Sequence, residues 1–285
     1  MERSRRIAGL GEVIERYKVL LIDAYGVIHD GRRVFPAVNE ALRRTRAAGR
    51  KVVVVTNSPQ RVAGMVFRLK DVGVEDGNYD AIACSGELTW RDLERRNGMN
   101  GALPRVHFIL QGSGIRWLSD VRNPMVDAVD EAEIVIAAGM PYGTEAEALG
   151  SRLPAALAAA RARNVPMLVA DSDETYPEDG RVRLGPGWIA RHYEKLGGTV
   201  VEYGKPFDPI YDEALAVVGG GVSPSEVLMI GDNLKTDIAG AARRGFDSLL
   251  VLEGGVHGWL SPEELATMAG ELGLSPTYVA RGLAW

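Results

Sequence analysis

Four groups of polar residues stand where apolar segments of the chain end, and their side chains are of types that handle phosphate and hard metal ions. They are Asp23-Ala24-Tyr25-Gly26, Thr56-Asn57-Ser58, Gly204-Lys205-Pro206, and Gly231-Asp232-Asn233 with Asp237. In open α/β sheets, ligands bind beyond the carboxyl ends of the strands. The four groups are therefore expected to form one site.

The chemistry expected of such a site is phosphoryl transfer. Asp23 and Asp232 can share a Mg²⁺ ion, which takes oxygen ligands and keeps several waters, and Asp237 is suited to orient that shell or the lysine. Thr56 and nearby backbone N–H groups can hold phosphoryl oxygens, while Lys205 supplies a positive charge that suits phosphate. An aspartate that attacks phosphorus gives an aspartyl-phosphate intermediate. Catalysis would then be mostly positioning and charge neutralisation.

The elements that must position these residues follow a βα alternation. Apolar, β-branched runs predict buried strands at 18–23, 51–56, 227–231 and 248–252. Segments of helical period predict helices at 37–48, 59–71, 236–244 and 262–272. This pattern favours an α/β fold, a doubly wound parallel sheet of Rossmann type.

The middle of the chain predicts a second, inserted domain. Its expected strands are 106–110, 134–138 and 166–170, with a long Ala-rich helix at 145–164. Polar, Gly- and Pro-rich stretches flank this block at 96–104 and 175–187, and a short strand at 200–202 follows it. We therefore expect a core made of residues 1–84 and 189–285, and an inserted α/β domain at 85–188.

Composition excludes several other classes of protein. A formal charge of -5 and a pI near 5.5 argue against a nucleic-acid binder. The single cysteine, Cys84, allows no intrachain disulfide, which fits a reducing cytoplasm. The apolar runs are too short to span a bilayer, so no membrane partner is expected.

The segments IDAYGVIHDG, VVVVTNSP, GKP and MIGDNLKTDIAGA resemble the four motifs of the haloacid dehalogenase (HAD) superfamily. GVIHDG and the place of the insertion are similar to class IIA, the NagD-like and p-nitrophenylphosphatase-like subgroup, which carries a large α/β cap there. The resemblance implies a phosphatase acting on a small organic phosphate, and a homodimer formed through the cap is also expected.

This resemblance also implies a role for each residue of the four groups. Asp23 would be the nucleophile, and Mg²⁺ would be bound by Asp23, the backbone carbonyl of Tyr25, and Asp232. Phosphoryl contacts would come from Thr56, Asn57, Ser58 and Lys205, with Asp237 as a supporting acid.

One residue departs from the superfamily's pattern. Tyr25 stands where most of its phosphatases have a second aspartate, which protonates the leaving group and later activates water. A phenol titrates near pH ~10, and losing such an acid removes about 10²–10⁴ in rate. Hydrolysis of alkyl phosphates is therefore expected to be slow, unless His29, six residues past Asp23, supplies the proton; otherwise His29 packs under or caps the turn after the strand.

Other interpretations remain open at this stage. A protein that binds a phosphorylated metabolite with little or no turnover is the main alternative, and Tyr25 favours it. Carbon–halogen and carbon–phosphorus cleavage fit less well, because the metal-site acids are intact and residues 85–188 contain no lysine. The run at 111–114 resembles a dinucleotide fingerprint but lacks its third glycine, so a plain turn in the insertion is the better interpretation. The acidic run at 171–174 is either a surface loop or a contributor to substrate choice.

Overall fold

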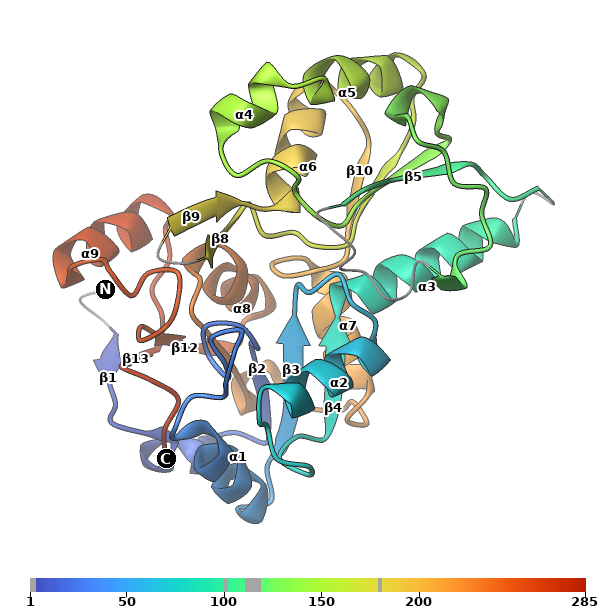
Figure 1. Cartoon of the computed structure of the whole chain (residues 1–285). Helices are drawn as coiled ribbons and strands as arrows, with labels where there is room; N and C mark the ends of the chain where they lie inside the picture. Colours follow the sequence, from blue (N-terminus) through green and yellow to red (C-terminus); the bar gives the residue numbers. More distant parts are fainter. Residues whose placement is uncertain (1–3, 100–101, 111–118, 179–180) are drawn as a thin grey trace. The chain divides into compact units, whose positions relative to one another are not determined.

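The structure is a computed structural model that describes residues 4–99, 102–110, 119–178 and 181–285. The chain divides into two compact units (Figure 1). Unit 1 comprises Met1–Thr56, Met65–Ala83 and Lys205–Trp285, and unit 2 comprises Asn57–Gly64 and Cys84–Gly204. The run at 111–114 lies outside the described residues.

A seven-stranded sheet forms the centre of unit 1 among the residues described. Its strands, in spatial order, are β1 (Arg5–Arg6), β13 (Tyr278–Ala280), β12 (Asp247–Val251), β11 (Val227–Gly231), β2 (Val19–Ile22), β3 (Lys51–Thr56) and β4 (Ala81–Cys84). Every pairing from β1 to β3 is parallel. All residues of β2 and β11 are buried, as their continuous apolar sequences predict for central strands covered on both faces.

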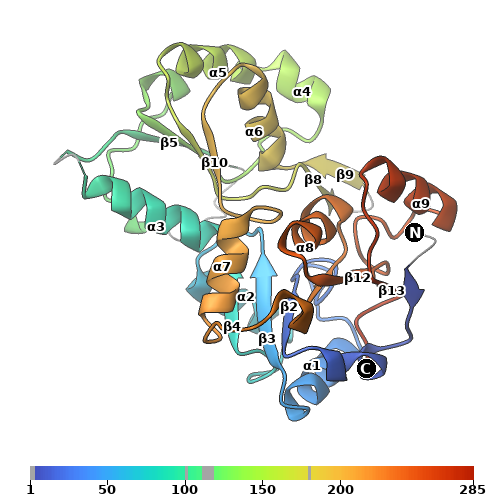
Figure 2. The ribbon, with the colours of Figure 1, turned by 180° about the vertical axis from the view of Figure 1, so that it is seen from behind.

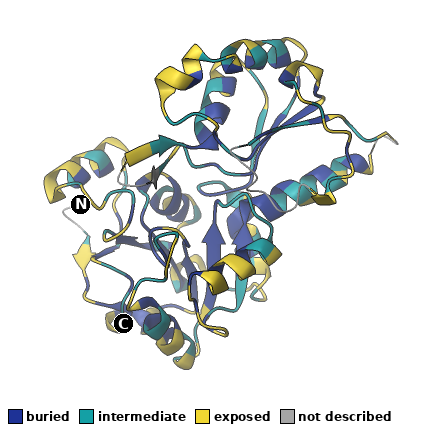
Figure 3. Ribbon diagram, in the orientation of Figure 1, coloured by how far each residue is buried: buried dark blue, intermediate teal, exposed yellow. Residues whose placement is uncertain are grey.

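Helices cover both faces of this sheet. They are α1 (Val38–Ala47), α2 (Val62–Asp71), α7 (Asp208–Ala216), α8 (Ala239–Arg244) and α9 (Pro262–Glu271). Figure 1 shows α1 and α2 in front of the strands, and Figure 2 shows α7 and α8 in front of the opposite face. The predicted doubly wound α/β fold is confirmed. Figure 3 shows that the central strands are buried, whereas the edge strand β1 and the outer surfaces of the helices are exposed.

Unit 2 has a four-stranded parallel sheet of its own. Its order is β10 (Val200–Glu202), β7 (Met167–Val169), β6 (Ile134–Ala137) and β5 (Val106–Ile109). The helices are α3 (Ser85–Asn97), α4 (Glu145–Gly150), α5 (Leu153–Ala162) and α6 (Pro186–Lys195), and an antiparallel hairpin joins β8 (Thr175–Glu178) to β9 (Arg181–Leu184).

Side chains alternate between the two faces of this smaller sheet. Val135 and Met167 pack with Leu157 of α5 and Tyr193 of α6, whereas the neighbouring Leu168 packs on the other face with a separate cluster. That second cluster includes the α3 residue Leu93, the β6 residues Ile134 and Ile136, and Tyr203, which follows β10. The period of two along each strand therefore builds a core on both faces.

Two expectations about this region need correction. The predicted helix 145–164 is two helices, because the chain turns at Ser151 and α5 starts again with Pro154 in its first turn. The polar stretch 175–187, which flanks the expected insertion, holds the hairpin and the start of α6. Unit 2 ends at Gly204 rather than at residue 188, because β10 pairs with β7 and not with the larger sheet.

Among the described residues, no helix is long and apolar enough to cross a membrane.

Candidate active site

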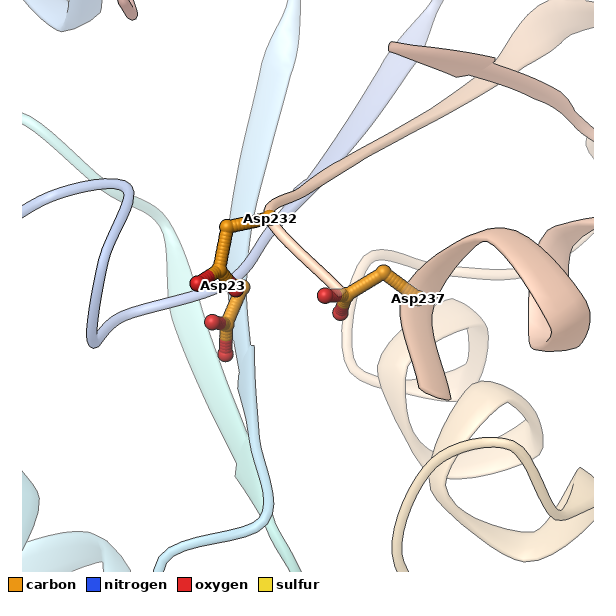
Figure 4. A group of neighbouring side chains, drawn as sticks. All are labelled: Asp23, Asp232 and Asp237. Atoms are coloured by element: carbon orange, nitrogen blue, oxygen red, sulfur yellow. The ribbon is translucent and has the colours of Figure 1, made fainter. Parts of the chain in front are cut away.

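Three buried carboxylates, those of Asp23, Asp232 and Asp237, lie together in unit 1. Each offers an oxygen atom, and these oxygens lie within 4.8 Å of one another. Figure 4 shows the three side chains turned toward a common point. The structure thus brings together the three acids that the sequence selected.

Parallel pairing explains how two of these acids meet. Ile22, the last residue of β2, pairs with Ile230 of β11. Asp23 and Asp232 follow these strands, so both stand at the carboxyl edge of the sheet. Asp237 comes from a single-turn π-helix (Leu234–Ile238) that precedes α8. The predicted helix 236–244 therefore begins with a π turn, a feature often found at functional sites.

Lys205 joins two of the acids. Its Nζ lies 2.5 Å from Oδ1 of Asp23 and 2.7 Å from Oδ1 of Asp237, and its side chain is 3% exposed. The other oxygen of Asp237 accepts the backbone N–H of Asn233 at 3.0 Å. Asp237 therefore holds both the lysine and the loop that follows β11.

Asp232 is the acid most strongly affected by its surroundings. Its burial, and then the charges of Asp23 and Asp237, raise the pKa of Asp232 well above the ordinary value for aspartate. The backbone N–H of Val256, which donates to its Oδ2 at 2.7 Å, acts in the opposite direction. Three carboxylates and one ammonium leave excess negative charge in this buried place, which a cation would offset.

The donor set fits a hard divalent cation. Asp23 and Asp232 offer carboxylate oxygens, which are the ligands that such a cation prefers. Glycines let the backbone approach closely, because a Cβ at Gly26 would lie 2.4 Å from Oδ2 of Asp232. Gly26 also has φ of +84°, a backbone conformation that favours glycine.

The loop after β12 supports Asp232, and the sequence analysis missed it. A Cβ at Gly255 would lie 2.4 Å from the Cβ of Asp232, and Val256 donates to its carboxylate. His257 Nε2 accepts the backbone N–H of Leu234 at 3.2 Å. The signal was present, because this Gly-rich segment follows a predicted strand and so lies at the same edge of the sheet.

The residues after β3 divide between the two units. Thr56 ends β3 in unit 1 and is buried, whereas Asn57 and Ser58 belong to unit 2. Asn57 Nδ2 donates to Oδ1 of Asp173 at 3.0 Å. Ser58 Oγ accepts the backbone N–H of Gln60 at 3.3 Å.

Tyr25 and His29 lie side by side in the turn after β2. Their rings meet edge to face at a centroid distance of 5.8 Å, and Tyr25 is 38% exposed. His29 is buried, and its Nδ1 accepts the backbone N–H of Gly31 at 3.0 Å. Burial, and then the charge of Arg68, lower the pKa of His29 to about 4. The imidazole is therefore neutral at ordinary pH and caps this turn.

Comparison with known proteins agrees with the site. Family models described as haloacid dehalogenase-like hydrolase and HAD-hydrolase-like match residues 20–115 and 202–285. The solved structure of a haloacid dehalogenase-like hydrolase from Brucella suis is 30% identical with a TM-score of 0.78, and the match covers 98% of this chain and 100% of that one. This chain belongs to the haloacid dehalogenase-like family of hydrolases, and it is an enzyme.

Two further relatives narrow the resemblance within this family. Mouse chronophin is 28% identical over 294 residues, covering 100% of this chain and 97% of the relative. A p-nitrophenyl phosphatase from Archaeoglobus fulgidus is 25% identical with a TM-score of 0.66, covering 93% of this chain and 96% of that one. The expected likeness to the NagD-like and p-nitrophenylphosphatase-like subgroup is confirmed.

Proposed function

We propose that this protein is a Mg²⁺-dependent phosphatase that moves the phosphoryl group of a small organic phosphate first to Asp23 and then to water. The observation that carries the proposal is the position of Asp23. Its carboxylate follows a buried strand, lies beside Asp232, and is 2.5 Å from the ammonium of Lys205. The phosphatase among its structural relatives supports the same chemistry.

Each residue of the cluster has a distinct part in this proposal. Asp23 attacks phosphorus through a carboxylate oxygen, and the bond from phosphorus to the leaving oxygen breaks. Lys205 offsets the negative charge of the phosphoryl oxygens, and Asp237 keeps the lysine ammonium in place. Thr56, Asn57 and Ser58 are assigned to contacts with the phosphoryl oxygens.

The metal assignment follows from the donor atoms. Asp23, Asp232 and the carbonyl of Tyr25 would hold Mg²⁺, which when bound supplies positive charge next to the phosphoryl group. The excess negative charge of the buried cluster and the close packing of Gly26 on Asp232 support this assignment.

Tyr25 limits the range of substrates. Without a carboxylic acid at this position, and with His29 neutral and bonded to Gly31, the leaving group departs largely unprotonated. Aryl and acyl phosphates tolerate this, because their leaving groups are stable anions. We propose that the enzyme prefers them over alkyl phosphates such as sugar phosphates, and that unit 2 is the cap domain that selects the organic part of the substrate.

A second candidate function is recognition of a phosphorylated metabolite without turnover, and the presence of Tyr25 favours it. One experiment distinguishes the two functions. Wild type and Asp23→Asn are assayed on aryl, acyl and alkyl phosphates with and without Mg²⁺, with Asp212→Asn as control. Asp212 is an aspartate of unit 1 whose side chain is 63% exposed.

The phosphatase proposal expects Mg²⁺-dependent turnover of aryl and acyl phosphates by wild type and by Asp212→Asn, and loss of that turnover in Asp23→Asn. Binding of these esters to wild type with no release of phosphate from any of them would instead establish the recognition function.

A further inference from the structure

Asn57 and Asp173, 116 positions apart in the sequence, share a hydrogen bond inside unit 2. Asn57 Nδ2 donates to Asp173 Oδ1 at 3.0 Å, and Asn57 is 2% exposed. A carboxylate accepts but does not donate, so it selects the NH₂ end of an amide. Asp173 therefore determines the orientation of the Asn57 amide. Nδ2 points toward Asp173, and Oδ1 points away from it.

The backbone around Asp173 is itself held in place. A Cβ at Gly185 would lie 2.0 Å from the carbonyl oxygen of Asp173, and one at Gly187 would lie 2.3 Å from that of Ser172. The N–H of Gly187 donates to the carbonyl of Asp173 at 3.0 Å, and the N–H of Asp173 donates to Oδ1 of Asp171 at 2.9 Å. The carboxylate of Asp173 is thus presented by a turn packed against two glycines.

The other end of the Asn57 amide meets a third glycine. A Cβ at Gly204 would lie 2.5 Å from Oδ1 of Asn57 and 3.2 Å from Oγ of Ser172. The chain passes between the units at Thr56–Asn57 and again at Gly204–Lys205. The two residues in close approach, Asn57 and Gly204, are therefore the sequence neighbours of Thr56 and Lys205.

Within unit 2, the segment Asn57–Gly64 makes further contacts through Arg61. Arg61 pairs with Glu87, with Nε 3.1 Å from Oε2, and its guanidinium lies 3.6 Å from the centroid of the Trp90 ring. Asn57, which follows Thr56 in sequence, thus lies in a segment that contacts other residues of unit 2, although Thr56 belongs to unit 1.

We propose that Asp173 is a positioning residue of the active site, acting through Asn57. It fixes the amide that the proposed function assigns to the phosphoryl oxygens, with Nδ2 toward Asp173 and Oδ1 toward Gly204. The inference rests on that proposed function. In this proposal Asp173 contributes to recognition of the phosphoryl group, which every substrate shares. It does not contribute to recognition of the organic part of the substrate.

Inorganic phosphate is the probe that tests this role. Its dissociation constant, measured by calorimetry with saturating Mg²⁺, is expected to rise about tenfold in Asp173→Ala and in Asn57→Ala, the effect of losing a hydrogen bond to a charged group. The double variant should bind phosphate no more weakly than Asn57→Ala, because Asp173 acts through Asn57. Asp173→Asn, which keeps an acceptor oxygen, should retain most of the affinity.

Two controls distinguish a positioning role of Asp173 from an effect on folding and from an effect on substrate selection. Glu174→Gln removes one formal charge from the same segment and should leave phosphate binding unchanged; Glu174 lines a separate 410 Å³ pocket in unit 2 with Trp188 and Lys195. For Asp173→Asn, kcat/KM should change by the same factor for phosphate esters with different organic parts.

Three results would each overturn the inference. They are losses of phosphate affinity that add up in the double variant, an unchanged phosphate affinity in Asp173→Ala, and no phosphate binding by wild type. A factor that varies with the organic part of the ester would also overturn it. If wild type binds phosphate but hydrolyses no ester, the proposed function fails while the calorimetric test of Asp173 stands.

Discussion

Lys205 Nζ lies 2.5 Å from Oδ1 of Asp23, although the two residues are 182 positions apart in the chain. The ammonium is also 2.7 Å from Asp237, so it lies between the proposed nucleophile and the acid that supports it. This one buried cation compensates part of the charge of three buried carboxylates.

Removing the cation should destabilise the protein. Lys205→Met leaves Asp23 and Asp237 without their ammonium partner, and breaking a buried ion pair costs about 3–5 kcal/mol. Chemical denaturation should show this loss in the free energy of unfolding without added metal. Lys18→Met is the control, because Lys18 is 62% exposed and pairs with Glu226 at the surface; an equally large loss there would contradict the assignment.

Mg²⁺ binding should depend on Asp232. In Asp232→Asn the affinity for Mg²⁺, measured by calorimetric titration, should fall by at least about tenfold, because a charged oxygen ligand becomes neutral. Glu226→Gln changes a partly exposed acid of the same unit, which pairs with Lys18, and should bind Mg²⁺ as wild type does. Equal affinity in wild type and Asp232→Asn would remove Asp232 from the metal site.

Asp232 should also affect how the stability of the metal-free protein depends on pH. Because the pKa of Asp232 is raised in the folded state, the folded protein holds a proton that the unfolded chain releases. The contribution of Asp232 to stability is therefore present below its unfolded pKa of 3.8 and declines as pH rises toward the folded pKa.

Unfolding experiments in a metal chelator test this sign. The free energy of unfolding of wild type, minus that of Asp232→Asn, should fall as the pH is raised above about 4. Saturating Mg²⁺ should reverse the trend, because the metal stabilises the charged carboxylate. A difference that increases with pH in the chelator would show that the charged form of Asp232 is favoured without metal.

Tyr25 should determine which esters are hydrolysed. Tyr25→Asp introduces an acid two residues after the nucleophile and should raise the rate on alkyl phosphates by up to about 10²–10⁴. Tyr25→Phe keeps the backbone carbonyl and the ring but lacks the hydroxyl, so it should match wild type on p-nitrophenyl phosphate. Fast hydrolysis of sugar phosphates by wild type would show that another group supplies the proton.

His29 should matter for stability and not for proton transfer. Its Nδ1 accepts the N–H of Gly31, and its pKa of about 4 keeps it neutral during the reaction. His29→Leu leaves that N–H without its acceptor and should lower the free energy of unfolding by about 1–3 kcal/mol. The pH dependence of kcat for aryl phosphates should not change; loss of a limb of that profile would make His29 catalytic.

The position of the acids could be predicted because it depends on strand ends. Uninterrupted apolar runs identify β2 and β11, and parallel neighbours necessarily place Asp23 and Asp232 at the same edge. The end of the insertion could not be predicted in this way. The sequence of Val200–Glu202 is compatible with a strand in either unit. Its pairing with β7 depends on tertiary contacts that the local sequence does not specify.

Other features depended on contacts that leave no periodic signal. The bond from Asn57 to Asp173 joins two loops, and the capping role of His29 depends on the local path of the turn. The break in the helix 145–164 did have a signal in Pro154, which is tolerated in the first turn of a helix but not in its interior.

The central claim is that Asp23 becomes phosphorylated, and a quenched single turnover tests it most directly. Wild type is mixed with p-nitrophenyl phosphate and Mg²⁺, stopped in acid at short times, digested and analysed by mass spectrometry. We predict a transient phosphoryl group on the peptide that contains Asp23, formed before inorganic phosphate is released and absent from Asp23→Asn. Release of phosphate by wild type with no such adduct at any time, together with full activity in Asp23→Asn, would contradict this account.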